Sequence, residues 1–183
     1  EDGYYLDLGD PLWRVVHIGE AGWQLLETSP VLFIRTPAMR ALPVPTYRRG
    51  TAEDLERLWD HIHVRTEDRP LVLAWLLECL RPETPIPLLE RVGEQGSAKS
   101  TTQSVLRDLV DRNKVQLRRR PKTVEDIFVA AANNWLVSYE YLSSLTAEQQ
   151  DALRTLATGG DSQRGSCSPT AKSTCCKPSV RSS

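Results

Sequence analysis

The sequence has no excess of charge and no long apolar run, and each absence excludes a class of protein. Its 183 residues carry 23 Lys and Arg against 24 Asp and Glu, a net charge of −1. Charge alone therefore gives no reason to expect a nucleic-acid or membrane-surface protein. The most apolar segment, residues 71–80, is far shorter than the roughly 20 residues of a membrane span. We accordingly expect a buried helix there, no membrane partner and a cytoplasmic location.

An initiator methionine and a paired set of metal ligands are also lacking. The chain opens at Glu1 without a basic, apolar leader, so we interpret it as starting inside a longer reading frame with no secretory signal. Of four cysteines, Cys79 lies in the apolar helical stretch, where packing is its expected role. The others, Cys167, Cys175 and Cys176, have no histidines or second cysteine pair at zinc-binding spacing, so no such site is expected.

The first 84 residues predict a β-rich segment followed by helices. In residues 1–46, four stretches rich in aromatic and branched side chains, separated by turn signals, predict an antiparallel meander: 4–8, 13–18, 23–26 and 31–35. Residues 47–84 predict a helical extension. Thr51 with Asp54 resembles a capping signal, and a second helix over 69–80 stops before Pro82. His61 and His63 are expected on the surface.

Residues 86–102, IPLLERVGEQGSAKSTT, carry the most informative pattern of the predicted core, 85–160. An apolar strand, a Gly-rich turn and a helix over 101–110 follow one another, the order that a phosphate-binding loop needs. The string matches G-x-x-x-x-G-K-[ST] except that Ala98 replaces the second glycine. In this motif Lys99 reaches the β- and γ-phosphates and Ser100 ligates Mg²⁺. An ordinary strand–loop–helix turn is the alternative.

The expected cofactors are therefore ATP and Mg²⁺. The nucleotide would be held by Gly93, Glu94, Gln95, Gly96, Ser97, Ala98, Lys99, Ser100 and Thr101.

Downstream segments supply the other candidate residues. A strand over 114–117, a helix capped by Thr123 and a strand over 135–140 are predicted. Glu140 ends the last strand, where such ATPases place the acid that holds the Mg²⁺ shell or orients the attacking water. We expect it to act with Lys99 in catalysis and with Ser100 at the metal; a solvated strand-end acid is the alternative. A final helix runs from Thr146 to about Leu156.

A run of three arginines forms the candidate nucleic-acid contact. Arg118, Arg119 and Arg120 follow the 114–117 segment directly. They are candidates for binding a phosphate backbone or a neighbouring subunit's nucleotide. A solvated charge run is the alternative.

Residues 161–183 differ in composition from everything before them. They hold seven Ser, three Cys, four Lys or Arg and no aromatic residue, as a disordered tail does. A one-base shift of the back-translated tail permits the reading GFATRVVFTDREEHVLQAKRPVI, which has the pattern of a folded protein. We interpret the tail as a frameshift, so that no function is expected of it.

Three strings together carry a resemblance to a known family: GEQGSAKST, the 135–140 strand with YLSSL after it, and DALRTLATGG at 151–160. They resemble P-loop ATP-binding proteins of bacterial prophages and other mobile elements, related to primase-helicase ATPases. The similarity covers about residues 3–160. It implies an α/β fold with a RecA/AAA+-like parallel sheet, incomplete here, and a DNA-directed ATPase that forms homo-oligomers in full-length relatives.

The resemblance also implies a loss of activity. In relatives the strand that here ends at Glu140 and Tyr141 ends in Asp-Asn, so the acid is kept and the amide is lost. The strand that precedes the γ-phosphate sensor in such ATPases is missing from this frame. We therefore expect an inactive ATPase fragment. A small-molecule or nucleotide kinase and a non-enzymatic remnant are the alternatives.

Overall fold

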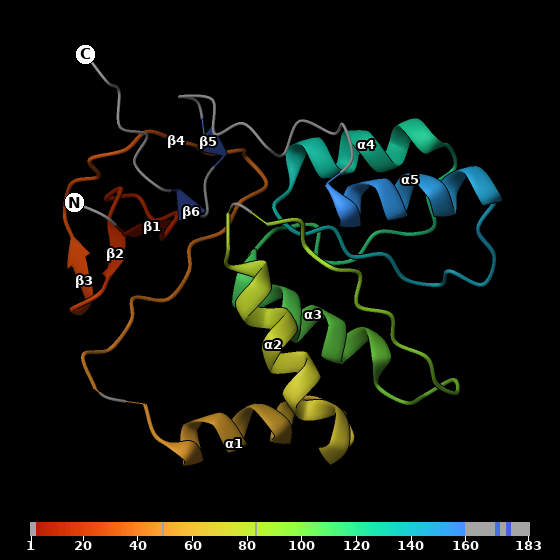
Figure 1. The fold of residues 1–183 in the computed structure, drawn as a ribbon, viewed down its shortest axis with the longest axis horizontal. Helices are drawn as coiled ribbons and strands as arrows, with labels where there is room; N and C mark the ends of the chain where they lie inside the picture. Colours follow the sequence, from red (N-terminus) through yellow and green to blue (C-terminus); the bar gives the residue numbers. More distant parts are fainter. Residues whose placement is uncertain (1–2, 49, 83, 160–170, 173–174, 177–183) are drawn as a thin grey trace.

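The computed structural model describes residues 3–48, 50–82, 84–159, 171–172 and 175–176, and it combines a small sheet with helices (Figure 1). The sheet forms where aromatic and branched residues alternate near the N-terminus. β1 (Tyr4–Asp7), β2 (Val15–Gly19) and β3 (Gly22–Leu26) pair antiparallel, and β6 (Cys175–Cys176) pairs antiparallel with the other edge of β1. The first three strands of the predicted meander are thus present.

The fourth predicted strand does not join this sheet. β4 (Phe33–Ile34) pairs in parallel with β5 (Ala171–Lys172) instead. The Ser29 hydroxyl bonds both the carbonyl and the amide of Val31, and this turn separates β4 from β3. The prediction of a structureless end is therefore wrong for these four tail residues. The rest of 161–183, including Cys167, lies outside the described residues.

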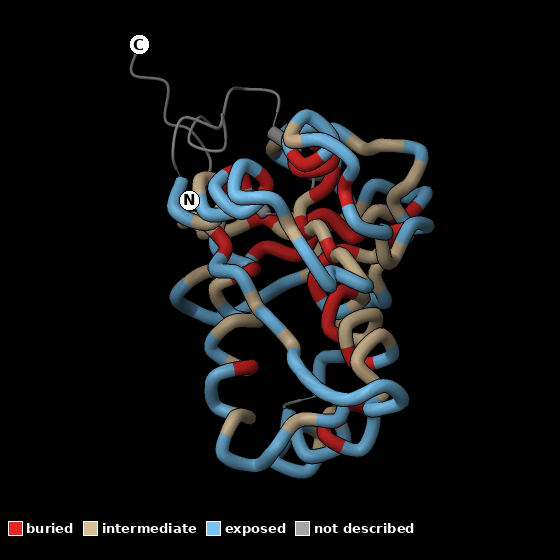
Figure 2. Tube along the Cα trace, turned by 90° about the vertical axis from the view of Figure 1, so that its right-hand side faces the viewer, coloured by how far each residue is buried: buried red, intermediate tan, exposed pale blue. Residues whose placement is uncertain are grey.

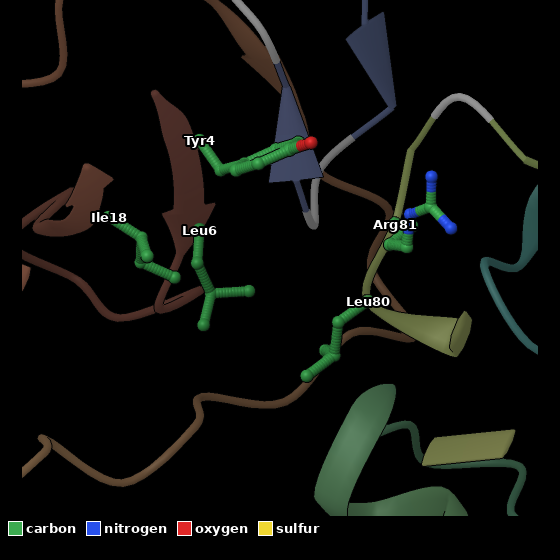
Figure 3. A pocket seen from close by; sticks show the side chains of 5 residues that line it. All are labelled: Tyr4, Leu6, Ile18, Leu80 and Arg81. Atoms are coloured by element: carbon green, nitrogen blue, oxygen red, sulfur yellow. The ribbon is translucent and has the colours of Figure 1, made fainter. Parts of the chain in front are cut away.

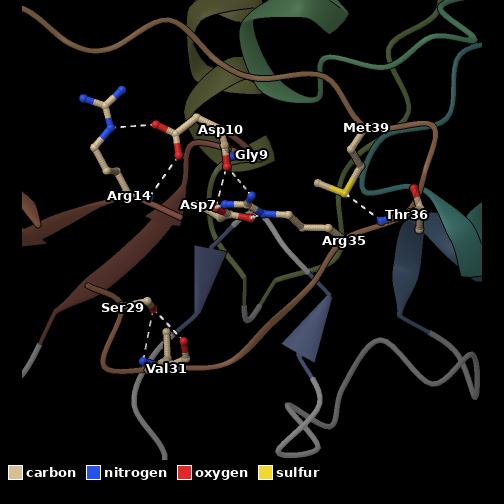
Figure 4. Close-up of polar contacts among 9 residues, drawn as sticks. All are labelled: Asp7, Gly9, Asp10, Arg14, Ser29, Val31, Arg35, Thr36 and Met39. Atoms are coloured by element: carbon tan, nitrogen blue, oxygen red, sulfur yellow. Dashed lines mark hydrogen bonds and ion pairs between the residues drawn. The ribbon is translucent and has the colours of Figure 1, made fainter. Parts of the chain in front are cut away.

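An ion-pair network holds the loop between β1 and β2 (Figure 4). Arg35 donates from Nε and Nη2 to both carboxylate oxygens of buried Asp7, and its guanidinium lies 3.8 Å from the ring centre of Trp13. Asp10 accepts from the backbone and the side chain of Arg14. These charges are paired and hydrogen-bonded, as buried charges have to be.

The helices begin where the sequence places their caps. α1 (Ala52–His61), α4 (Val124–Asn133) and α5 (Ala147–Thr158) each follow a threonine whose hydroxyl accepts from the third helical amide, and the side chain at that third position bonds back to the threonine amide. α2 (Arg69–Cys79) follows a short 3₁₀ turn, Thr66–Asp68, and α3 spans Lys99–Val110. These helix predictions are confirmed to within a few residues at the ends.

Apolar clusters connect these helices around α3. Trp59, Ile62, Val72 and Leu106 join α1, α2 and α3. A second cluster joins Cys79 of α2, Ile86, Val110 of α3 and Leu136, so Cys79 packs in the core as expected. Figure 2 shows the buried residues gathered along the middle of the molecule. Burying one such side chain contributes ~1.5–3 kcal/mol, so α3 is firmly held behind the candidate loop.

Within residues 85–159, where a parallel sheet is predicted, the structure forms one parallel bridge. Residues 86–92 and 114–117 are not regular strands, and 135–140 contributes only a parallel bridge from Tyr139 to Arg118. Its two backbone bonds run from the Arg118 amide to Ser138 and from the Glu140 amide to Arg118. An apolar run becomes a regular strand only when a neighbouring strand accepts and donates its backbone hydrogen bonds, and these three segments lack such a neighbour over most of their length.

Two further features complete the fold. An apolar hollow of about 280 Å³ separates Tyr4, Leu6 and Ile18 of the sheet from Leu80 and Arg81 after α2 (Figure 3). Among the described residues, none of the helices has the length and apolar character to cross a bilayer.

Candidate functional site

The Gly-rich segment curls into a tight turn before α3. The amide and the hydroxyl of Ser97 both donate to the Glu94 carbonyl, at 3.3 and 2.9 Å. Gly96 has a positive φ of 85°, which glycine adopts freely. Ala98 has φ 52° and ψ 26°, the left-handed region that an L-residue enters at a cost of ~1–2 kcal/mol. The second glycine of the motif is therefore missing at a position that demands one.

The start of α3 offers backbone amides to an anion. The first hydrogen bond of the helix runs from the Thr102 amide to the Ala98 carbonyl, at 3.0 Å. The amides of Lys99, Ser100 and Thr101 therefore have no acceptor within the helix, and the helix dipole adds partial positive charge at the same place. A phosphate group matches both features.

Lys99 points back into the turn. Its ammonium donates to the Gly93 carbonyl at 2.7 Å, to the Glu94 carbonyl, and to the Ser97 hydroxyl at 3.2 Å. None of these oxygens carries a full charge, so a phosphate would be a stronger partner for the ammonium. The ammonium is therefore held by uncharged oxygens of the turn itself.

Ser100 and Glu140 meet across the site although 40 residues separate them in the chain. The Ser100 hydroxyl oxygen lies 3.5 Å from Oε2 of Glu140. Two oxygens bound side by side to one Mg²⁺ at 2.0–2.1 Å are ~3 Å apart, so a small movement brings both into one metal shell. The backbone bridge at Arg118 and a 2.9 Å bond from Gln103 to the Tyr139 carbonyl position Glu140 against α3.

The described residues contain no group of three or more His, Cys, Asp or Glu side chains able to hold a metal. The contact between Ser100 and Glu140 is a pair of oxygens and not such a group.

The three arginines of the predicted nucleic-acid contact have different surroundings. Arg118 is half-buried, its backbone makes the bridge to residues 138–140, and its Nε has no hydrogen-bond partner. Arg119 and Arg120 are exposed, and Arg120 donates to the Ser144 hydroxyl at 2.9 Å. Arg119 and Arg120 are therefore the more accessible of the three.

Arg91 is a site residue that the sequence did not reveal. Its guanidinium donates to the Lys99 carbonyl at 2.7 Å and to the His63 carbonyl at 2.8 Å. Burial lowers the pKa of Arg91. The partner carbonyls lie 8 and 28 residues away in the chain. No local pattern signals such contacts.

Comparison with known proteins now gives the chain a family. The model of the actinomycete integrative conjugative element replication protein matches residues 53–169, well over half of the sequence. The chain belongs to this family. The match includes the turn at 93–98, Lys99, Ser100 and Glu140, and it excludes the N-terminal sheet. The resemblance to replication proteins of mobile elements is thereby confirmed at this level. No curated protein and no solved structure matches the chain.

Proposed function

We propose that this replication protein binds a nucleoside triphosphate with Mg²⁺ at residues 93–101 and Glu140. The observation that carries the proposal is the ammonium of Lys99 lying inside the turn that opens α3. Lys99 and the free amides of α3 neutralise and orient the phosphates. Mg²⁺ supplies charge neutralisation on the β- and γ-oxygens when bound. Ser100 and Glu140 are the side chains that hold it or its water shell.

The reaction class we propose is DNA-directed, helicase-like ATP hydrolysis, with little turnover by this chain. Family membership supports a role in replication of a mobile element. The exposed Arg119 and Arg120 lie next in the chain to Arg118, whose backbone pairs with that of Glu140. They are our candidates for the DNA contact. Low turnover is expected because Tyr141 follows the acid where such ATPases carry an amide side chain, so the group that helps to position Mg²⁺ or the attacking water is missing.

Lys99→Ala tests the binding site. Because Lys99 is the one side-chain cation inside the turn, we expect ATP affinity to fall by about tenfold or more, ~1.4 kcal/mol or above, in a titration monitored by calorimetry. Exposed Lys122→Ala is the matched control and should leave affinity unchanged. Equal binding by wild type and Lys99→Ala would contradict the proposal.

ATP hydrolysis measured with and without single-stranded DNA tests the reaction class. Stimulation by DNA belongs to a helicase-like enzyme and not to a small-molecule or nucleotide kinase. Binding with no hydrolysis under either condition identifies the non-enzymatic alternative.

A further inference from the structure

A hollow beside the candidate phosphate loop extends from the loop to the end of α1. Its volume is about 560 Å³, within the range of small-molecule sites. One wall comes from the end of α1 and residues 62–65, and the other from residues 91–93 and the loop. The lining residues that matter here are Trp59, Ile62, His63, Val92, Ser97 and Lys99.

The chemistry of the hollow changes from one wall to the other. The loop wall carries the Lys99 ammonium and the Ser97 hydroxyl, which suit phosphate oxygens. The α1 wall mixes the apolar Ile62 and Val64 and the ring of Trp59 with the exposed imidazole of His63 and the charged Asp60 and Arg65, and the apolar Val92 lies on the loop side. A nucleotide has the same order of parts, since a charged phosphate chain leads through a polar sugar to a flat, largely apolar base.

Hydrogen bonds fix the two walls relative to each other. Arg91 bonds the carbonyl of Lys99 on one wall and that of His63 on the other. The His63 amide donates to the fully buried Thr102 hydroxyl of α3 at 3.0 Å. The 62–65 segment is thereby held at a fixed distance from the start of α3, as a site that receives both ends of one ligand requires.

We propose that this hollow holds the nucleoside of the bound nucleotide, with the base against His63 and Val92. The inference deepens the proposed function and rests on it. It assigns to the helical extension before the loop a binding role beyond packing.

The double variant His63→Ala with Val92→Ser tests the inference. Both side chains are exposed, Val92 at 88%, so the fold should be kept. The affinities of ATP and of inorganic tripolyphosphate are measured by calorimetry, each with Mg²⁺. We expect the Kd for ATP to rise about tenfold, since the base loses an apolar and an aromatic contact. The Kd for tripolyphosphate, which has no nucleoside, should stay within about twofold of wild type.

The matched control is His61→Ala with Val129→Ser, two exposed residues of the same types outside the hollow; it should bind both ligands as wild type does. Unchanged ATP affinity in the test variant, or an equal loss for both ligands, would overturn the nucleoside pocket and leave the phosphate loop in place. If wild-type protein binds neither ligand, the proposed function falls as well.

Discussion

Ala98 has a left-handed backbone conformation, which its Cβ atom makes unfavourable. Its φ of 52° lies in the left-handed region, where glycine is favoured because it has no Cβ. Tyr141, next to Glu140, has φ 57° in the same region. Relatives of the kind the sequence resembles place Asn after the acid, and Asn tolerates this conformation better than Tyr. The departure of Ala98 from the loop motif and the presence of Tyr141 after the acid thus both coincide with unfavourable backbone geometry beside the candidate site.

Ala98→Gly should stabilise the protein. Relief of the left-handed conformation favours the folded state by ~1–2 kcal/mol, and the greater freedom of glycine in the unfolded chain offsets ~0.4–1 kcal/mol of it. We expect a net gain of ~0.5–1 kcal/mol in urea unfolding. The control Ala132→Gly, inside α4, should lose ~1 kcal/mol because its backbone is right-handed helix. A loss at Ala98 as well would contradict the assigned conformation.

Asp10 should make stability depend on pH in the acid range. Burial alone would raise the pKa of Asp10, but the side-chain and backbone hydrogen bonds from Arg14, with the charges of Arg14 and Arg35, lower it below its usual value. A pKa that is lower in the folded state stabilises the protein above the unfolded-state pKa, near 3.9, and the stabilisation is lost as pH falls through the folded-state value.

Asp10→Asn removes this effect. We expect the variant to lose ~1–3 kcal/mol of unfolding free energy at pH 7, because the bonds from Arg14 lose their charged acceptor, and to lose less at pH 3. Urea unfolding between pH 3 and 7 measures the difference. Exposed Asp60→Asn should run parallel to wild type. A constant difference between Asp10→Asn and wild type over that range would show that the carboxylate charge is not the cause.

For helices and strands, the sequence predicts those features that depend on neighbouring residues, and it does not predict which distant strands pair. Helices α1, α4 and α5 were predictable because a threonine cap and an apolar face lie within a few residues of each other. The same locality made the turn at 93–98 recognisable. The position of β4 depends on residues 171–172, far along the chain, and no periodicity in 31–35 encodes that partner. Arg91 escaped prediction for the same reason.

Arg91→Lys tests the two hydrogen bonds by which Arg91 connects the segment before the loop to Lys99 and His63. A guanidinium reaches two carbonyls with separate N–H groups, whereas a single ammonium on a flexible stem does not reproduce that fork. We expect ~1–2 kcal/mol lower stability in urea unfolding, from one lost charged hydrogen bond, and weaker ATP binding. The exposed Arg57→Lys on α1 is the matched control. Wild-type stability in Arg91→Lys would show that one contact suffices.

For the whole molecule, the contact between the sheet region and the helical core determines whether the two unfold together. Segment 38–40 lies antiparallel to 112–114, with backbone bonds from Arg40 to Arg112 and from Lys114 to Ala38. Asn113 is the middle residue of segment 112–114 and is almost fully buried. Its side chain donates to Asn134 at 3.2 Å and accepts from the Val115 amide at 3.0 Å. The sheet, which lies outside the family match, is thus connected to the core by backbone hydrogen bonds on either side of Asn113, whose side chain is bonded within the core.

Asn113→Ala should destabilise both parts at once. Its loss leaves the Val115 amide without this acceptor, whereas Oδ1 of Asn134 keeps the bond from Arg107. We therefore expect a cost of ~1–3 kcal/mol. Tryptophan fluorescence and far-UV circular dichroism should follow one urea transition in wild type and in the variant, shifted to lower urea in the variant. The control Asn133→Ala, exposed at the end of α4, should stay near wild type. Two separate transitions in wild type would show that the sheet folds independently of the core, because residues coupled through one network unfold as a unit.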